Sequence, residues 1–479
     1  IVRFWIITVI LVLVGLAGLK IRRGSVMVQP IKNSKLAAKT LIVGLGATGL
    51  SCARFLASQG VQVAIADSRE EPPGLQALHA EYPDIAVFLG PFDDALFDSV
   101  ERLVVSPGVP VSTPQIDAAR RRGIPVMGDI ELFVRAAQAP VVAITGSNGK
   151  STVTTLLAEM AKACGVVVAA GGNLGTAALD LLDDAVELYV LELSSFQLET
   201  TDSLQAAVAA VLNISPDHMD RYPDLAAYAA AKARVLEGAG VGVYNADDPV
   251  VAAMSGADDA WYFTLGESHE QKTFGVCRVD AEAYLCRGEQ PLLAAAELKI
   301  HGLHNRANAL AALAMGTALG FDQAAMAEVL RSYRGLPHRT EFVAEINGVR
   351  WYNDSKATNV GASLAALEGL HEDDDSRVVL IAGGDCKAAD FSALTPALES
   401  CARAVVLIGR DAEAVAAVVP AGLARVEAAD MDEAVGRAAE LALPGDRVLL
   451  SPACASFDMF SGYAQRGDRF MQAVRRLVQ

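Results

Sequence analysis

Short runs of β-branched and aliphatic residues alternate along the chain with longer stretches rich in alanine and leucine. Apolar runs of about 4 to 8 residues that end at Gly, Asp or Pro are typical of buried strands, whereas the longer stretches have the length of helices. The first strands are predicted at TLIVGLG, VQVAIAD and RLVVSPG, with a helix over residues 49–59 between the first two. This alternation predicts α/β layers built on parallel sheets.

The strand–helix pattern restarts twice. VVAITGSNGKST reads as strand, glycine-rich loop and helix, and LYVLELSS and AAVAAVLNIS continue a second sheet. A third block after GLPHRTEF has predicted strands at RVVLIAGG, RAVVLIGR and DRVLLSPA. A length of 479 residues also favours about three domains. We therefore expect domains at residues 27–128, 129–336 and 337–479, preceded by an apolar segment at 1–26.

Composition and charge limit the classes of partner. Hydrophobic residues make up 52% of the chain and charged residues 20%, as in a folded protein rather than a disordered one. The formal net charge of −17 disfavours a general nucleic-acid binder, but it leaves room for a local basic pocket that holds a phosphorylated ligand.

The seven cysteines form no CxxC pair and leave one over. This usage is typical of a reducing cytosol and predicts neither a disulfide framework nor a zinc site. The cysteines are Cys52, Cys164, Cys277, Cys286, Cys386, Cys401 and Cys454.

The most informative stretch of the chain is AITGSNGKST, between a predicted strand and a predicted helix. Glycines there allow backbone N–H groups to face an anion at the helix start. Lys150 can reach the β- and γ-phosphates of a nucleotide, and the Ser151 hydroxyl is placed to meet Mg²⁺. We expect ATP to bind at Gly146, Ser147, Asn148, Gly149, Lys150, Ser151 and Thr152.

This loop departs from the common GxxxxGK[ST] pattern, because Ile144 stands where the first glycine is expected. The compact form TGSNGKST resembles the loop of Mur ligases and folylpolyglutamate synthetases, and it disfavours GTPases and motor ATPases. The resemblance to Mur ligases extends from Lys39 to Leu477. It implies an α/β fold of three domains: an N-terminal Rossmann-like domain, a central P-loop ATPase-type domain and a C-terminal Rossmann-like domain.

Three further motifs carry candidate metal ligands. Glu192, in LELSSFQLE, ends a buried-looking strand, where a carboxylate is a suitable hard ligand for Mg²⁺. His218, in NISPDHMDRY, lies in a loop after a strand, which is where α/β folds place ligands. Lys232, in YAAAKARV, would by default be a solvated helix lysine. The resemblance implies instead that His218 binds a second Mg²⁺ and that Lys232 becomes a carbamate, an oxygen ligand for that ion.

Other motifs are assigned by resemblance to the nucleotide. Asn305 and Asn308 are three apart at a predicted helix start and so share a face; helix capping is the alternative reading of either residue. In the family such a pair helps to hold the adenine end of ATP. Arg339 can clamp phosphate. By resemblance, Asp354 meets the ribose of ATP, and Lys356 and Thr358 lie by the phosphates and the incoming amino acid.

LIVGLGATGL places Gly44, Gly46 and Gly49 after a strand, and Asp67 ends the next strand. Alone, this GxGxxG pattern would favour a nicotinamide-dependent oxidoreductase. With a second nucleotide loop at Lys150, the resemblance implies that the first domain binds the uridine nucleotide of a sugar substrate. The expected contacts are Gly46, Ala47, Thr48, Asp67, Ser68, Arg69 and Ser106, with Asn173 of GGNLG near the same substrate.

The third domain is expected to hold the amino acid. In the members of the family that add D-glutamate, positions matching Lys387 and Ser456 bind its carboxylates; a surface lysine is the alternative reading of Lys387. The chain has no DNPR-type motif of the relatives that add diaminopimelate or lysine, and this favours D-glutamate. The expected contacts are Thr358, Lys387, Ser456, Phe457 and Tyr463.

The resemblance thus implies a cytoplasmic, monomeric, ATP- and Mg²⁺-dependent ligase that joins D-glutamate to UDP-N-acetylmuramoyl-L-alanine through an acyl phosphate. It implies no nucleic-acid partner. The rival readings are another Mur ligase or a folylpolyglutamate synthetase, the oxidoreductase above, and a membrane-tethered nucleotide-binding scaffold.

The scaffold reading rests on the apolar run Phe4–Leu19, which is flanked by basic residues. The run is somewhat shorter than the roughly 20 residues that span a bilayer. A membrane anchor, a signal peptide and a segment foreign to the enzyme are the three readings. IVRFWIITVILVLVGLAGLKIR resembles the C-terminal end of the phospho-N-acetylmuramoyl-pentapeptide transferases, membrane enzymes of the same pathway. We therefore favour a read-through or fusion remnant, with Met27 as the natural start.

Overall fold

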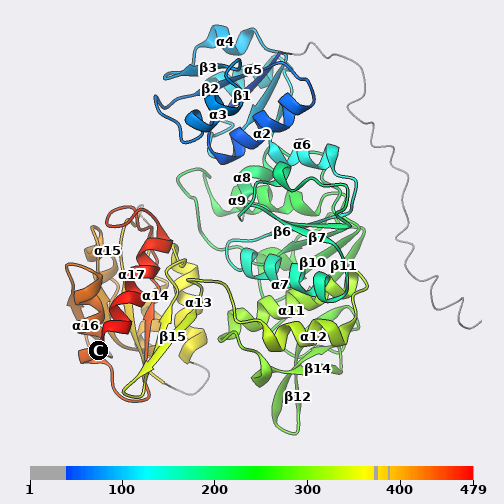
Figure 1. Ribbon diagram of the computed structural model, residues 1–479. Coiled ribbons are helices and arrows are strands. Elements are labelled where there is room, and N and C mark those ends of the chain that lie inside the picture. Colours follow the sequence, from blue (N-terminus) through cyan, green and yellow to red (C-terminus); the bar gives the residue numbers. More distant parts are fainter. Residues whose placement is uncertain (1–38, 174, 372–375, 387–388, 478–479) are drawn as a thin grey trace, which may run out of the picture. The chain divides into compact units, whose positions relative to one another are not determined.

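The computed structural model describes residues 39–173, 175–371, 376–386 and 389–477, and the apolar segment at 1–26 lies outside them. Within these ranges the strands form three sheets, each built from a separate stretch of chain (Figure 1). The α/β class predicted from the sequence is therefore confirmed. No helix among the described residues combines the length and the apolar character needed to cross a membrane.

The first sheet has five parallel strands in the order β3-β2-β1-β4-β5. Its strands read as continuous apolar runs because both faces are covered: Leu41 and Val43 pack on one side and Ile42 on the other. The strands are β1 Thr40–Val43, β2 Val63–Asp67, β3 Ala86–Leu89, β4 Arg102–Val105 and β5 Val126–Met127. The helices are α2 Ala47–Ser58, α3 Leu75–Glu81, α4 Asp94–Asp98 and α5 Pro114–Arg121.

The second sheet has nine strands in the order β14-β13-β12-β11-β10-β9-β6-β8-β7. The strands from β7 to β12 are parallel, and β13 and β14 extend the sheet as antiparallel hairpins. Val142 and Ile144 face a core that includes residues of α7 and α11, and Val141 and Ala143 face the opposite side. The strands are β6 Val141–Thr145, β7 Val168–Gly172, β8 Leu188–Glu192, β9 Val208–Val211, β10 Val241–Asn245, β11 Asp259–Phe263, β12 Thr273–Val279, β13 Glu282–Arg287 and β14 Gln290–Ala294. The α-helices are α6 Asp129–Ala136, α7 Lys150–Ala163, α8 Ser195–Leu198, α9 Leu225–Ala233, α10 Pro249–Ala252, α11 Leu303–Ala318 and α12 Gln323–Ser332, and the 3₁₀ helices are η1 Ala178–Leu181, η2 Arg234–Leu236 and η3 Ala295–Glu297.

A disulfide joins Cys277 of β12 to Cys286 of β13, with the two Cα atoms 6.0 Å apart. The expectation that the cysteines form no disulfide is therefore wrong for this pair. The two residues are diagonal neighbours, because Cys286 pairs with Gly275 and Cys277 pairs with Tyr284 in the antiparallel register. Cysteine spacing could not reveal the pair, since the hairpin register alone brings the sulfurs together.

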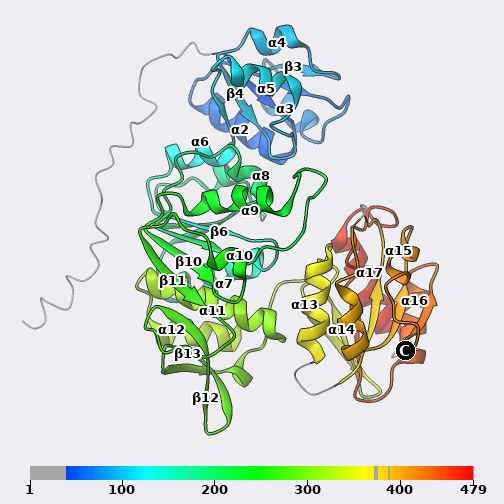
Figure 2. The ribbon, with the colours of Figure 1, turned by 180° about the vertical axis from the view of Figure 1, so that it is seen from behind.

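The third sheet has six strands in the order β15-β16-β20-β17-β18-β19, and β15 alone is antiparallel to its neighbour. Leu380 of β17 packs in a core with residues of α13 and α14, and Ile381 packs in a core with residues of α16 and α17 (Figures 1 and 2). The strands are β15 Glu341–Ile346, β16 Val349–Asn353, β17 Val378–Ala382, β18 Ala402–Leu407, β19 Ala424–Glu427 and β20 Arg447–Leu450. The helices are α13 Val360–His371, α14 Leu394–Cys401, α15 Ala412–Ala416, α16 Met431–Leu441 and α17 Tyr463–Arg476.

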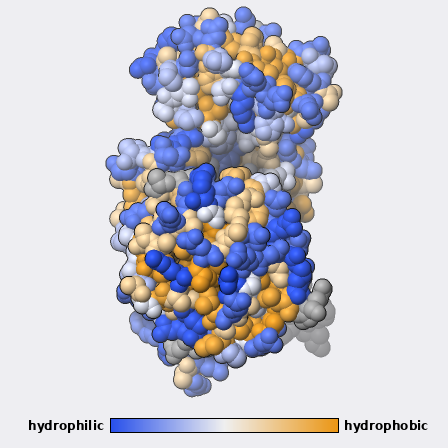
Figure 3. All heavy atoms as spheres, turned by 90° about the vertical axis from the view of Figure 1, so that its left-hand side faces the viewer, coloured by the Kyte–Doolittle hydropathy of each residue, from blue (hydrophilic) through white to orange (hydrophobic). Residues whose placement is uncertain are grey.

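Strand order decides which loops become neighbours. In the second sheet, β6 lies between β8 and β9, and β7 lies beside β8, so the loops after these strands meet at one edge. In the third sheet, the carboxyl ends of β16, β20 and β17 are adjacent. Such edges are where open α/β sheets bind ligands. The outer surface seen in Figure 3 is a mixture of polar and apolar residues.

Candidate active site

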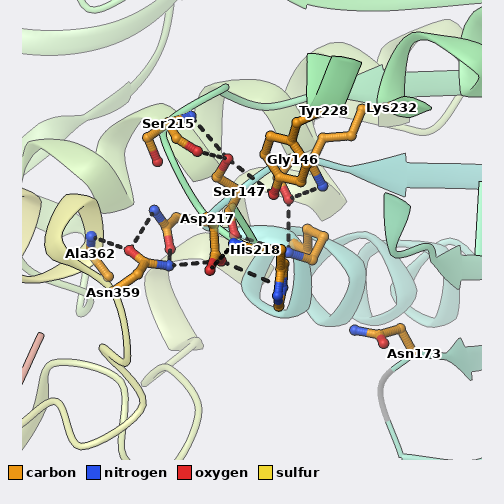
Figure 4. A network of polar contacts seen from close by, with 12 residues as sticks. Gly146, Ser147, Asn173, Ser215, Asp217, His218, Tyr228, Lys232, Asn359 and Ala362 are labelled. Carbon is orange, nitrogen blue, oxygen red and sulfur yellow. Dashed lines mark hydrogen bonds and ion pairs between the residues drawn. The ribbon is translucent and has the colours of Figure 1, made fainter. Parts of the chain in front are cut away.

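The loop between β6 and α7 is held in shape by the loop that follows β9. The backbone N–H of Asn148 donates to Asn213 Oδ1 at 2.8 Å, and the Asn213 amide returns a bond to the Asn148 carbonyl at 3.1 Å. The Ser147 hydroxyl accepts from the Ser215 N–H and donates to the Ser215 carbonyl, both at 2.9 Å (Figure 4). These bonds fix the loop before any anion arrives.

Gly149 is required by two features of this loop. Its φ of +84° lies in the left-handed region that side chains disfavour, and a Cβ atom there would lie 2.4 Å from Asn308 Oδ1. Asn308 in turn donates to Asn305 Oδ1 at 3.2 Å, and Asn305 donates to the His301 carbonyl at 2.8 Å. The two asparagines thus share a face of α11, as their spacing predicted, and Asn308 lies against the glycine-rich loop.

Lys150 begins α7, and its ammonium folds back over the loop. It donates to the carbonyls of Gly146 at 2.8 Å and Ser147 at 3.0 Å. Burial lowers the pKa of Lys150, and the charge of Glu192 opposes this effect. The lysine is therefore placed at the anion-binding end of the helix, where a phosphate could replace the carbonyls as its partner.

Glu192, at the end of β8, is buried and lies at the centre of a polar cluster. Its carboxylate accepts from the Ser151 hydroxyl at 2.6 Å and from the Asn173 amide at 2.6 Å. Arg339 donates to Ser151 Oγ at 2.6 Å. Side chains from distant parts of the sequence thus meet at one point beside the phosphate loop. They offer oxygen atoms that can bind a metal ion and one positive charge, that of Arg339.

Lys232 is 1% exposed, although it lies on α9 in an alanine-rich stretch. Its ammonium donates to the Gly146 carbonyl at 2.9 Å and lies 4.6 Å from the centre of the Tyr228 ring. Burial, reinforced by the charge of Lys150, places the pKa of Lys232 well below its usual value. The default interpretation of Lys232 as a solvated helix lysine is therefore wrong, because α9 turns this face toward β6.

His218 also lies close to Tyr228, with the centres of the two rings 6.5 Å apart. Its backbone φ is +58°, and its ring Nε2 is 3.7 Å from Asp217 Oδ2. Burial lowers the pKa of His218, and the carboxylate of Asp217 opposes the change. Asp217 also accepts from the Asn359 amide at 3.2 Å (Figure 4). Among the described residues, no three His, Cys, Asp or Glu side chains form a metal-binding group.

Asp354 and Lys356 follow β16, as part of a second cluster at the edge of the third sheet. Asp354 is buried and accepts from the Ser451 hydroxyl at 2.8 Å and from the Thr340 N–H at 3.1 Å. Burial raises the pKa of Asp354 to about 7 in spite of these bonds. Burial, with the charge of Arg339, lowers the pKa of Lys356 to about 8.

The loop after β20 joins this cluster. Lys356 Nζ lies 4.3 Å from the centre of the Tyr463 ring, and the Ser355 hydroxyl donates to the Tyr463 carbonyl at 2.7 Å. Ser456 is buried, whereas Phe457 is 70% exposed. Thr358 is half-buried in the same loop as Lys356, and Lys387 lies outside the described residues.

The first sheet carries a separate cluster. Arg69 makes two side-chain bonds to the Asp67 carboxylate, at 2.9 and 2.7 Å, and the Leu45 N–H donates to the same carboxylate at 2.7 Å. Burial would raise the pKa of Asp67, but these bonds lower it to about 2. A Cβ atom at Gly49 would lie 1.9 Å from the Gly44 carbonyl oxygen, so this glycine allows α2 to pack closely on β1.

The remaining residues predicted for the sugar nucleotide lie around this cluster. Gly46, Ala47 and Thr48 form the start of α2, and Ala47 and Ser68 are exposed. The Ser106 hydroxyl donates to the Gly44 carbonyl at 2.8 Å. Asn173 is not part of this cluster, because it follows β7 and contacts Glu192.

Family models match almost the whole described chain. The N-terminal domain of MurD-like Mur ligases matches residues 38–128, the Mur ligase middle domain matches residues 144–316, and the Mur ligase glutamate ligase domain matches residues 338–454. The chain belongs to the Mur ligase family. The resemblance inferred from its motifs is thereby confirmed.

Similar curated proteins match this Mur ligase over almost their whole length. The UDP-N-acetylmuramoylalanine–D-glutamate ligase of Nitrosococcus oceani is 56% identical over 446 residues, which cover 93% of this chain and 98% of that protein. The proteins of the same name from Pseudomonas putida and Methylobacillus flagellatus are 53% and 52% identical, over 91% and 92% of this chain and 97% of each relative.

Solved structures support the fold. The UDP-N-acetylmuramate–alanine ligase of Thermotoga maritima has a TM-score of 0.57 at 19% identity and covers 92% of this chain and 100% of its own. A MurF structure from Acinetobacter baumannii has a TM-score of 0.55 at 17% identity, over 92% of this chain and 93% of its own.

Several residues of this Mur ligase's site were not singled out from the sequence. Asn213 and Ser215 clamp the phosphate loop, Tyr228 contacts both His218 and Lys232, and Asn359 contacts Asp217. The sequence did contain a signal for Asn213 and Ser215. Both come at the end of the apolar run AAVAAVL, in the loop after a predicted strand, which is where α/β folds place ligand-binding residues. Tyr228 gave none, since an aromatic residue in a helix is usually a core residue.

Proposed function

We propose that this Mur ligase joins D-glutamate to UDP-N-acetylmuramoyl-L-alanine with ATP as the energy source, in peptidoglycan precursor synthesis. The observation that carries the proposal is the convergence of Lys150, Ser151, Glu192 and Lys232 on one glycine-rich loop. The relatives that are 52–56% identical over nearly their full length bear the name of this ligase.

The reaction begins when the carboxylate of the alanyl group attacks the γ-phosphate of ATP and ADP leaves. The amine of D-glutamate then attacks the carbonyl carbon of the acyl phosphate, and phosphate leaves with formation of the amide. Two anions must approach in the first step, so cations are needed at the point of transfer. Lys150, Arg339 and Lys356 supply them, and their side chains hold the transferred group in line.

The donors around Glu192 fit magnesium, which prefers oxygen ligands. The Ser151 hydroxyl and the Glu192 carboxylate already lie 2.6 Å apart in a buried position. His218 and Lys232, the latter as a carbamate, would hold a second ion, and the low pKa of Lys232 supports carbamate formation because CO₂ adds only to a neutral amine. Bound magnesium would neutralise phosphate oxygens and polarise the phosphoryl group.

Each substrate binds mainly at one of the three sheets, in the proposed domains at residues 27–128, 129–336 and 337–479, and residues of a second domain complete the sites of ATP and of the sugar nucleotide. The uridine nucleotide binds at the Asp67–Arg69 cluster, together with Gly46, Ala47, Thr48, Ser68 and Ser106. Asn173 meets the sugar end of the same substrate. Asn305, Asn308 and Asp354 serve the adenosine of ATP. D-Glutamate is held by Thr358, Lys387, Ser456, Phe457 and Tyr463. We place the enzyme in the cytoplasm as a monomer.

The test is ligation by the purified full chain with ATP, magnesium and UDP-N-acetylmuramoyl-L-alanine. Radiolabelled D-glutamate should enter the nucleotide product with one ADP released for each amide, while L-glutamate, L-lysine and meso-diaminopimelate should not. Lys150→Ala is the matched inactive control. Unincorporated D-glutamate would contradict the proposal, and transfer of another amino acid or of glutamate to a folate would identify a different ligase.

A further inference from the structure

Two buried cysteines from distant parts of the sequence lie in contact beside the proposed amino-acid site. Cys386 follows β17 and is 5% exposed, and Cys454 follows β20 and is 1% exposed. Their sulfur atoms are 2.6 Å apart, although 68 residues separate them in the chain. The contact arises because β17 and β20 are neighbours in the third sheet.

The backbone places the two side chains where a cross-strand disulfide can form. Asp385 and Ala455 exchange two backbone hydrogen bonds, of 3.0 and 2.9 Å, as an isolated antiparallel bridge. Cys386 and Cys454 are the next pair along this bridge, in the position that is not hydrogen-bonded. At such positions opposite Cα atoms are about 4.5 Å apart, which lies within the range that a disulfide spans.

Arg466 keeps one side of this pair in place. Its guanidinium is 1% exposed and donates to the Cys454 carbonyl at 3.1 Å and the Ala455 carbonyl at 3.2 Å. On the other side, the Cys386 N–H donates to Asp411 Oδ2 at 2.9 Å. Both cysteines are therefore held face to face by bonds from outside the pair.

We infer that Cys386 and Cys454 are a reversible oxidation site, whose disulfide ties the loop of Ser456 to the end of β17 and weakens the use of D-glutamate. The effect on D-glutamate rests on the function proposed above. Ser456 lies two residues beyond Cys454 and is buried. Closing the sulfur contact from 2.6 Å to a bond of about 2.05 Å pulls on the loop that carries Ser456.

The oxidant is hydrogen peroxide or another small peroxide. One thiolate attacks a peroxide oxygen and the O–O bond breaks, which gives a sulfenic acid and, after protonation, water. The second thiol attacks the sulfenic sulfur, the S–O bond breaks, and a second water leaves as the S–S bond forms. Two thiols thus lose two electrons and two protons, and one peroxide becomes two waters.

The neighbouring thiol of Cys386 and burial both raise the pKa of Cys454. Since the thiolate is the reactive form, oxidation should be slow at neutral pH and faster at pH 9. Burial also favours a small oxidant over a bulky disulfide such as oxidised glutathione. A thiol reductant such as dithiothreitol should restore the free pair.

The first experiment locates the disulfide without reference to activity. The full chain is treated with hydrogen peroxide, free thiols are alkylated, and the unreduced protein is digested with trypsin. Cleavage after Arg377, Lys387, Arg447 and Arg466 gives a cross-linked species of residues 378–387 and 448–466, which dithiothreitol should separate. Its absence at peroxide levels that oxidise the half-exposed Cys164 would overturn the inference.

The second experiment measures the consequence. Oxidation should raise the KM for D-glutamate by at least ~5-fold, since displacing Ser456 by a fraction of an ångström weakens its contact with the substrate. Cys386→Ala should be active when reduced and unaffected by peroxide, and Cys164→Ser should respond like the parent. Cys454→Ser repeats the test should Cys386→Ala fold poorly. A cross-link that leaves the KM unchanged would overturn the proposed effect, whereas a reduced parent that cannot ligate would instead contradict the proposed function.

Discussion

Lys232 shows how strongly a fold can change the chemistry of one residue. Its sequence neighbours are alanines, which suggest a solvated helix, yet the side chain is 1% exposed and bonded to the Gly146 carbonyl. The helix packs this face toward β6, and burial then lowers the pKa of the amine. A lysine in this setting is neutral more often than a surface lysine and can take up CO₂.

Replacing Lys232 with Ala should reduce the rate of ligation by about 10³-fold or more, because the carbamate that would hold the second magnesium ion at the phosphoryl group is lost. A short carboxylic acid such as acetate or propionate should restore part of the rate by supplying the missing oxygens. Steady-state ligation assays with and without the acid check this. Lys162→Ala, which removes an exposed surface ion pair with Glu159, is the matched control and should retain full activity. Full activity of Lys232→Ala would refute a metal-binding carbamate.

Asp129 gives a prediction on stability and pH. It is buried, it accepts from the Gln197 amide at 2.9 Å, and burial raises its pKa to about 6. A raised carboxyl pKa means that the folded state binds more protons than the unfolded state between about pH 4 and pH 6, so stability falls as pH rises through this window.

Asp129→Asn cannot ionise and should escape this loss. Relative to the parent, its free energy of unfolding should rise by about 2.4 kcal/mol between pH 4 and pH 8. Urea unfolding of both proteins across this range measures the difference. A difference that does not change with pH would show that the Asp129 carboxyl keeps an ordinary pKa in the folded protein.

At the scale of elements, the loop between β6 and α7 depends on contacts outside itself. Asn213 and Ser215, after β9, hold its backbone, and Asn308 of α11 fills the space beside Gly149. The glycine-rich motif is therefore only one part of the anion site. The neighbouring strand and helix complete it.

Gly149→Ala should abolish detectable ATP binding, because the added Cβ would collide with Asn308 Oδ1 in a backbone conformation that alanine disfavours. The matched control is Gly165→Ala at the other end of α7, where φ is +79° and nothing lies within 4 Å of the added atom. Both changes should cost about 1 kcal/mol of unfolding free energy from φ alone. Calorimetric titration with ATP separates them, and equal ATP affinity in the two variants would argue against the contact with Asn308.

At the scale of the whole molecule, the polar clusters belong to different sheets. Asp67 and Arg69 lie at the edge of the first sheet, the Glu192 cluster at the edge of the second, and Asp354 at the edge of the third. Each edge is the carboxyl end of parallel strands, where loops converge. This division predicts that the substrates can be weakened one at a time.

Asp67→Asn should raise the KM for the uridine nucleotide substrate by ~10-fold, through loss of the charge-assisted bonds that hold Arg69, and should leave the KM for ATP within about 2-fold. Steady-state kinetics with each substrate varied in turn check this. Asp98→Asn, which breaks an exposed ion pair with Arg122, should change neither value. An equal change in both KM values would show that the two sites are not separate.

The sequence by itself determined the α/β class, the glycine-rich loop at Lys150 and its resemblance to Mur ligases, because these features lie in short stretches whose spacing reflects local geometry. Only the tertiary structure decided which distant residues meet: the burial of Lys232, the cluster around Glu192, the Cys277–Cys286 disulfide and the contact of Cys386 with Cys454. The physical reason is strand order. Hydrophobic periodicity shows which face of a strand is buried, but the neighbours of that strand are chosen by how the whole sheet packs.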